Sequence, residues 1–178
     1  GLFVNTAGVG ILEHDRIIQP RAVRPGDAVL VNGDLGRHGM AILSVRQGLE
    51  FESPIESDCA PLADLVLALL AAGLEVHALR DLTRGGLTAG LNEIATTGGV
   101  QIDIDEAAVP VNEAVRGACE ILGFDPLYVA NEGRLVAFVP EAEVPRALEI
   151  MRGLSAGAGA VRIGAVPAGT PGLVTVQR

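Results

Sequence analysis

At 178 residues, the chain is long enough for one ordinary domain, or for one domain and part of another, with a buried core of useful size. Its net charge of −9 argues against a nucleic-acid partner and against binding to an anionic membrane surface, because both attract basic proteins. Only 3% of the residues are aromatic and none is Trp, so the core is aliphatic and offers few side chains on which bases can stack.

The first half of the chain alternates between strand and helix patterns. Residues 2–12 are apolar with glycines, and we expect them to end a preceding structural unit. The turn at 24–27 (Arg-Pro-Gly-Asp) marks a domain boundary. The elements expected next are a strand over 28–32, a helix over 36–47, a helix capped by Ser57 or Asp58 and running to Ala72, a strand over 75–79 and a helix over 87–95.

The second half continues in the same way. The elements expected are a strand over 100–105, a helix over 111–122 that ends at Gly123, a strand over 134–139, a helix over 141–154, and strands over 160–166 and 173–176. Residues 155–172 are rich in Gly and Ala, but strand patterns interrupt them, so they are not a linker. This mixture predicts an α/β fold, as a two-layer sandwich.

The two cysteines, Cys59 and Cys119, form no metal-ligand pattern. They indicate a reducing compartment, the cytoplasm, and no disulfide framework. Both fall in helical patterns, so we expect small buried apolar groups and not nucleophiles. No apolar run is long enough to cross a bilayer, and the first residues do not resemble a signal peptide.

The segment Asp81–Gly86 is the most informative part of the chain. An apolar strand pattern ends at Asp81, two glycines follow at Gly85 and Gly86, and a helical pattern begins. Such a helix start can bind an anion through its free N–H groups. Thr83 adds a hydroxyl group and Arg84 a planar cation.

A purely structural interpretation of this segment remains open. In it, the glycines supply positive φ angles and Asp81 or Thr83 caps the helix. The local sequence alone favours this interpretation, because short glycine motifs often match by chance.

Three further segments place polar groups at turns. Residues 33–39 contain His38 after a strand, although a lone His is more often structural than catalytic. Residues 52–59 gather three acids, of which we interpret Glu52 and Glu56 as solvated, while Asp58 suits either a helix cap or a site. Glu132 lies beside a glycine with apolar flanks, where its pKa can be raised so that it accepts a proton. The alternative for Glu132 is an exposed hairpin turn.

Four segments, in order, resemble the C-terminal domain of the HypE family, the carbamoyl dehydratases of hydrogenase maturation. They are residues 33–39, 56–62, 80–95 and 128–133. Each match is weak alone, but together they cover about residues 26–176 and are specific. The family belongs to the superfamily of aminoimidazole ribonucleotide synthetase and selenophosphate synthetase. The resemblance implies an α/β domain with a mixed sheet over residues 26–178.

The resemblance also implies a reaction. Enzymes of this family accept a carbamoyl group on the thiol of a C-terminal cysteine and use ATP, with Mg²⁺, to activate the carbamoyl oxygen as a phosphate. Loss of that phosphate leaves a thiocyanate, whose cyanide goes to the iron of an immature nickel–iron hydrogenase. The partners implied are a carbamoyltransferase and the iron-scaffold maturation proteins.

Site roles follow from the same resemblance. We expect Glu132 to remove the amide protons, with Asp81 and His38 as further catalytic candidates; Asp81 serves equally well as an indirect metal partner. We assign no direct metal ligand in this chain. The residues expected on the cofactor side are Thr83, Arg84, Gly85, Gly86, Asn131 and Arg37, and Arg37 and His38 are expected to line the substrate channel.

The chain departs from the family pattern at both ends. It ends without the terminal cysteine, and it lacks nearly all of the N-terminal domain that holds most ATP and magnesium ligands in the family. We therefore expect a fragment without turnover of its own, in which residues 1–25 are a remnant of the N-terminal ATP-binding domain and the connection. The family dimerises through that domain, so the intact protein is expected to be a homodimer.

Two alternatives remain. One is another ATP-dependent member of the superfamily, a selenophosphate or an aminoimidazole ribonucleotide synthetase; segments 57–62 and 131–133 argue against both. The other is a non-catalytic domain that docks maturation partners.

Overall fold

The computed structural model describes residues 1–48 and 54–178, and within these residues the chain forms five α-helices and six β-strands. The strands are β1 (Asp27–Val31), β2 (Ala78–Asp81), β3 (Ile102–Asp105), β4 (Leu135–Pro140), β5 (Val161–Ala165) and β6 (Val174–Gln177). The helices are α1 (Arg37–Gln47), α2 (Ala63–Ala71), α3 (Gly86–Gly98), α4 (Glu113–Leu122) and α5 (Val144–Arg152). Short 3-10 helices are η1 (Pro20–Ala22), η2 (Glu106–Ala108), η3 (Pro126–Tyr128), η4 (Glu141–Glu143) and η5 (Ser155–Gly157).

The six strands form one sheet in the order β2-β4-β1-β5-β3-β6. Neighbouring strands are antiparallel except for β3 and β6, which run parallel, so the predicted α/β class with a mixed sheet is confirmed. The register pairs Asp81 of β2 with Leu135 of β4, and Val31 of β1 with Val136. The segments that follow β1 and β2 and the segment that precedes β4 therefore meet at one end of the sheet.

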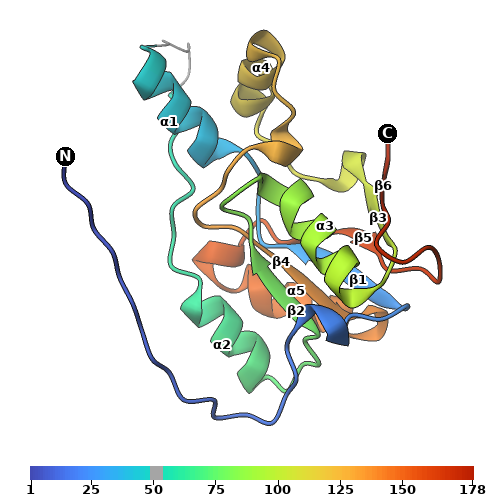
Figure 1. Cartoon of the computed structure of the whole chain (residues 1–178). Helices are drawn as coiled ribbons and strands as arrows, with labels where there is room; N and C mark the ends of the chain where they lie inside the picture. Colours follow the sequence, from blue (N-terminus) through green and yellow to red (C-terminus); the bar gives the residue numbers. More distant parts are fainter. Residues whose placement is uncertain (49–53) are drawn as a thin grey trace.

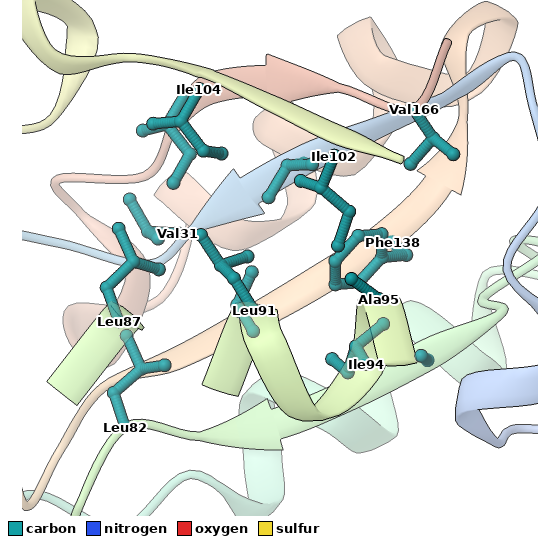
Figure 2. Close-up of a cluster of buried hydrophobic side chains, with 14 of the residues drawn as sticks. Val31, Leu82, Leu87, Leu91, Ile94, Ala95, Ile102, Ile104, Phe138 and Val166 are labelled. Atoms are coloured by element: carbon teal, nitrogen blue, oxygen red, sulfur yellow. The ribbon is translucent and has the colours of Figure 1, made fainter. Parts of the chain in front are cut away.

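Helices pack on both faces of this sheet (Figure 1). On one face, Leu87, Leu91 and Ile94 of α3 pack against alternate residues of the strands, including Val31 and Phe138, as Figure 2 shows. On the other face, α2 and α5 cover the strand residues that alternate in sequence with those facing α3, such as Leu30 and Ala137. The strand period of two thus gives each face its own apolar core.

A third apolar cluster lies outside the sheet, between α1 and α4. It contains Met40, Val115, Cys119 and Val129. Residues 1–17 form no helix or strand, and they run outside the folded body (Figure 1). None of the helices described in residues 1–48 and 54–178 combines the length and the apolar character needed to cross a membrane.

Most predicted elements are present, but the predicted cap of the second helix is wrong. The helix α2 begins at Ala63, and its first amides donate no hydrogen bond to the side chain of Ser57 or Asp58. The reason is tertiary, because the Asp58 carboxylate accepts hydrogen bonds from other segments of the chain. The strand expected over 75–79 is also displaced and runs from Ala78 to Asp81. Glu52, interpreted as solvated, lies outside the described residues.

Cys59 also differs from its prediction. It lies in the loop before α2, where its side chain is exposed, instead of in a helix. Cys119 is buried in α4, as predicted. Both thiols are free.

Candidate functional site

Four loops meet at the end of the sheet defined by the register above. They are the loop between β1 and α1, the loop before α2, the glycine turn between β2 and α3, and the turn before β4. Each of the four segments on which the family resemblance was based contributes residues to one of these loops. The sheet brings them together although more than ninety residues separate the first from the last.

Leu82 joins the glycine turn to the turn before β4. Its amide donates to the carbonyl oxygen of Arg134 at 3.0 Å, and its carbonyl oxygen accepts from the amide of Asn131 at 3.1 Å. Since the Leu82 side chain is fully buried, this junction is also packed into the core. The predicted phosphate turn and the predicted proton acceptor, Glu132, are therefore neighbours.

Asn131 links three loops by its side chain. Its Oδ1 accepts from the amide of Gly36 at 2.8 Å, and its Nδ2 donates to the carbonyl oxygens of Leu82 and Val129 at 3.2 and 3.0 Å. The residue has no exposed surface. All of its polar side-chain atoms are used inside the chain, so its contacts are those of a structural link and differ from the cofactor-binding role predicted for it.

Asp58 is the second buried link. Its Oδ1 accepts from the amides of Glu132 and Gly133 at 2.7 and 3.0 Å, and its Oδ2 accepts from the amide of His38 at 3.1 Å. The residue is 4% exposed. A Cβ atom on Gly133 would overlap with the carbonyl oxygen of Asp58, so the close approach of these loops requires glycine there.

His38 and Glu132, both predicted to be catalytic, face each other at the junction of these loops. The Nε2 atom of His38 lies 3.8 Å from Oε1 of Glu132, and its Nδ1 atom lies 2.9 Å from Oγ of Ser57. The side chains of His38 and Glu132 are 23% and 38% exposed. The apolar residues that flank Glu132 in the sequence suggested a more enclosed side chain. In the structure the Glu132 carboxylate is partly exposed and accessible to a substrate.

The glycine turn has the predicted backbone but not the predicted cap. Gly85 and Gly86 have φ angles of 72° and 61°, which glycine adopts without strain. A Cβ atom on Gly86 would lie 2.6 Å from the carbonyl oxygen of Leu127, so α3 packs closely on η3. Gly85 occupies the cap position of α3 without a side-chain hydrogen bond, so neither Asp81 nor Thr83 caps this helix.

Asp81 instead organises its own turn. Its Oδ2 accepts from the amide of Thr83 at 3.3 Å, and its Oδ1 lies 3.2 Å from the guanidinium of Arg80. Partial burial raises the pKa of Asp81, but the hydrogen bonds from Thr83 and the charge of Arg80 outweigh it and hold that pKa below its ordinary value. With 60% of its side chain exposed, Asp81 is an available carboxylate.

Arg84 is exposed at the start of α3. Among the described contacts its guanidinium has no carboxylate partner within ion-pair distance, whereas Arg80 next to it pairs with Glu93 at 2.8 Å. The hydrogen bond between Arg80 and Glu93 raises the pKa of Arg80 and lowers that of Glu93. Arg84 and the first amides of α3 therefore supply positive potential at the surface of the turn.

Arg37 has a different environment from His38. Its Nε lies 2.8 Å from Oδ2 of Asp34, although the N–H is not directed at that oxygen and makes no hydrogen bond. The Oδ1 atom of Asp34 accepts from Arg134, which is 7% exposed, at 2.6 Å. Arg37 and His38 also line separate cavities, of about 190 and 280 Å³, so the structure does not place them in one channel.

Several residues that build this site carry no local signal in the sequence. Asp34 and Arg134 pair across 100 positions of the chain. Asn32, which is 1% exposed, accepts from the amide of Leu135 and donates to the carbonyl oxygens of Gly133 and Ala156. Only the motif of residues 33–39 could have drawn attention to Asp34, as a carboxylate between two glycines.

In the part of the chain that the structure describes, no group of three or more His, Cys, Asp or Glu side chains is arranged to hold a metal ion. Mg²⁺ in nucleotide sites is usually held by one or two carboxylates together with substrate phosphates, so this finding concerns only sites built from protein side chains.

Known proteins resemble this chain over nearly its whole length. The carbamoyl dehydratase HypE of Rhodobacter capsulatus is 51% identical over 177 residues, which cover 99% of this chain and 52% of that protein. A structure of the hydrogenase maturation protein HypE in complex with ATP is 43% identical, with a TM-score of 0.86, over 89% of this chain and 49% of that chain. A structure of a HypE–HypF complex has the same identity and TM-score, over 90% and 52%. The chain thus spans about half the length of these relatives.

The resemblance identified from the four motifs is confirmed by these similarities. Residues 24–176 also match the family described as AIR synthase related protein, C-terminal domain. This match covers β1 to β5, α1 to α5 and β6 as far as Val176, and it leaves out η1 and the residues before it. The chain therefore belongs to the family of C-terminal domains of AIR synthase related proteins.

Proposed function

We propose that this chain is the C-terminal half of an ATP-dependent carbamoyl dehydratase, which converts a cysteine-bound carbamoyl group into a thiocyanate. The cyanide then becomes a ligand of the iron in nickel–iron hydrogenase. The observation that carries the proposal is the 51% identity to a carbamoyl dehydratase HypE over 99% of the chain. The meeting of His38 and Glu132 at 3.8 Å supports it, because dehydration of an amide needs a group that removes protons.

The reaction removes one oxygen and two protons from the carbamoyl group. We assign the removal of the N–H protons to Glu132, whose carboxylate is exposed beside His38. The imidazole of His38 holds the carboxylate in place when it is charged and can pass the proton on. The sulfur–carbon bond is kept, and a carbon–nitrogen triple bond forms as the carbamoyl oxygen leaves.

ATP, when bound, supplies the phosphate that makes the carbamoyl oxygen a good leaving group. The glycine turn fits a phosphate in chemical type, through the exposed Arg84, the hydroxyl group of Thr83 and the backbone at Gly85 and Gly86, of which Gly85 is exposed. We keep Asp81 as a catalytic or indirect metal partner, since its carboxylate is exposed beside this surface. Magnesium ligands belong, in this proposal, to the other half of the protein.

The proposal extends to organisation and partners. We assign residues 1–25 to the connection with an N-terminal ATP-binding domain, and residues 26–178 to the C-terminal domain; the family match, which begins at residue 24, supports this division. A carbamoyltransferase of the HypF type is the proposed donor partner, supported by the structure of a HypE–HypF complex. The proposed acceptor of the cyanide is an iron-scaffold maturation protein. We further propose that the intact protein is a homodimer and that it is located in the cytoplasm.

The test uses the longer protein that includes this chain, supplied with carbamoyl phosphate, ATP and the carbamoyltransferase. Mass spectrometry of the modified cysteine peptide should detect the loss of one water molecule from the carbamoylated form. Glu132→Gln should lower the rate of this loss by about 10²-fold or more. Glu120→Gln, on the exposed face of α4, removes the same charge and should have no effect.

Either alternative would give a different result. A selenophosphate or aminoimidazole ribonucleotide synthetase would leave the carbamoyl peptide unchanged and consume ATP only with its own substrate. A docking domain would tolerate substitution of Asp81, Arg84 and Glu132 without loss of rate. Calorimetry with Mg-ATP tests whether the nucleotide site is shared between the two halves of the protein. We expect the longer protein to bind Mg-ATP and this chain alone not to bind it.

A further inference from the structure

We infer that Asp58 is a positioning residue, which together with Ser57 sets the geometry of His38 and Glu132 at the candidate site. The inference rests on the proposed function in so far as it concerns catalysis. Its structural part, which concerns the contacts of Asp58, stands without that function. By its sequence, Asp58 suited either a helix cap or a site, and Ser57 suited only a helix cap.

The two oxygens of Asp58 divide between the two candidate residues. One accepts from the amide of Glu132 at 2.7 Å and the other from the amide of His38 at 3.1 Å. Each of these amides belongs to the residue whose side chain faces the other at 3.8 Å. One carboxylate therefore fixes the two backbone points from which the facing side chains extend.

Burial makes this link rigid. Asp58 is 4% exposed, so water does not compete well for its oxygens. A third hydrogen bond, from the amide of Gly133 at 3.0 Å, holds the turn on the far side of Glu132. Charge-assisted hydrogen bonds of this kind are stronger than neutral ones, so the carboxylate has a function that an amide side chain cannot fully replace.

Ser57 adds a constraint on the imidazole ring. Its Oγ lies 2.9 Å from Nδ1 of His38 and also accepts from the amide of Cys59 at 3.1 Å. Because Oγ accepts from the amide, its own hydrogen is free to point at Nδ1. That arrangement leaves the hydrogen of a neutral ring on Nε2, the nitrogen that faces Glu132. Ser57 and Asp58 thus act on the same histidine, on its ring and on its backbone.

The first experiment measures geometry, by NMR of the chain with Asp58→Asn. An asparagine keeps one acceptor oxygen but presents an NH₂ group on the other side, so it cannot accept from both His38 and Glu132. We expect faster amide hydrogen exchange at one or both of these residues. Asp64→Asn is the matched control, because Asp64 is exposed in the first turn of α2 and loses the same charge.

The second experiment measures catalysis in the longer protein. Asp58→Asn should lower kcat for loss of water from the carbamoyl peptide by about 10²-fold, the effect of a displacement of about 1 Å at a reacting pair, and leave KM for ATP unchanged. Asp64→Asn should change neither. A smaller folded fraction would also lower the apparent kcat at an unchanged KM, so kcat is calculated from the concentration of folded protein, measured by circular dichroism.

Ser57 provides a variant without risk to folding, since the residue is exposed. Ser57→Ala should shift the ¹⁵N resonances of the His38 ring and lower kcat, whereas Ser57→Thr, which keeps the hydroxyl group, should restore both. Wild-type exchange at His38 and Glu132 in Asp58→Asn, or an unchanged kcat, would overturn the inference. If the wild-type protein does not dehydrate the carbamoyl peptide, the proposed function fails, while the exchange measurement still decides the role of Asp58.

Discussion

The Nδ1 atom of His77 lies 2.7 Å from Oδ2 of Asp27, and both side chains are buried, at the end of the sheet opposite the candidate site. The same Asp27 oxygen accepts from the amide of Arg24 at 3.0 Å. The pair joins the start of β1 to the segment before β2. We predict that Asp27→Ala lowers the free energy of unfolding by about 3 kcal/mol, because it leaves buried donors without an acceptor.

Urea unfolding measures this loss, and Asp64→Ala is the control at an exposed aspartate. The Asp27 variant should keep the amide exchange of His38 and Glu132 unchanged, since it acts at the other end of the sheet. Equal stability of the two alanine variants would contradict the prediction.

Gly39 is predicted to tolerate no side chain. A Cβ atom there would overlap with Cγ1 of Val129 and lie 3.2 Å from the amide nitrogen of Ala130. Gly39→Ala should therefore lower the free energy of unfolding by about 1–3 kcal/mol. Gly117→Ala in α4, where nothing lies within 4 Å of the added atom, should instead stabilise the protein by about 1 kcal/mol. Thermal unfolding of the two variants should give shifts of opposite sign.

Asn131 is predicted to stabilise the fold in the absence of any ligand. Asn131→Ala removes three side-chain hydrogen bonds in a fully buried position, at a cost of about 3 kcal/mol in unfolding free energy. Asn92→Ala removes one exposed hydrogen bond in α3 and should cost less than about 0.5 kcal/mol. A normal stability for the Asn131 variant, combined with weaker nucleotide binding, would instead favour the cofactor-binding role.

The Arg80–Glu93 pair predicts a dependence of stability on pH. The pKa of Glu93 is lowered in the folded state, so its contribution is present above the ordinary pKa of 4.5 and is lost as the pH falls through the lower folded value. Because Glu93 is 59% exposed, the contribution should stay below about 1 kcal/mol. Urea unfolding of Glu93→Gln should show lower stability than wild type at neutral pH and a smaller decrease on acidification. Glu120→Gln should follow the wild type.

The two cysteines should differ in reactivity. Cys59 is exposed, while burial, with a smaller contribution from Asp125, raises the pKa of the Cys119 thiol. A thiol reagent at mildly alkaline pH should modify one cysteine of the native protein rapidly, and peptide mapping should identify Cys59. Cys119 should react only after the protein has been unfolded in urea. Rapid modification of Cys119 in the native state would contradict this burial.

Local sequence determined the elements of this protein. Short apolar runs predicted β1 and β4, and the glycines at 85 and 123 marked a helix start and a helix end with the positive φ angles they adopt. These signals act over a few residues, so they can be read without a fold. Four short motifs together were also enough to identify the family.

Tertiary structure alone decided how the site is built. Asp58 looked like a helix cap because its immediate neighbours suit one, yet its carboxylate binds amides 20 and 74 positions away. Asn131 looked available to a ligand, but the fold places it among three loops and uses every polar atom of its side chain. Hydrogen-bond partners of buried polar groups are set by the register of the sheet, which brings distant loops together, and no local pattern records that register.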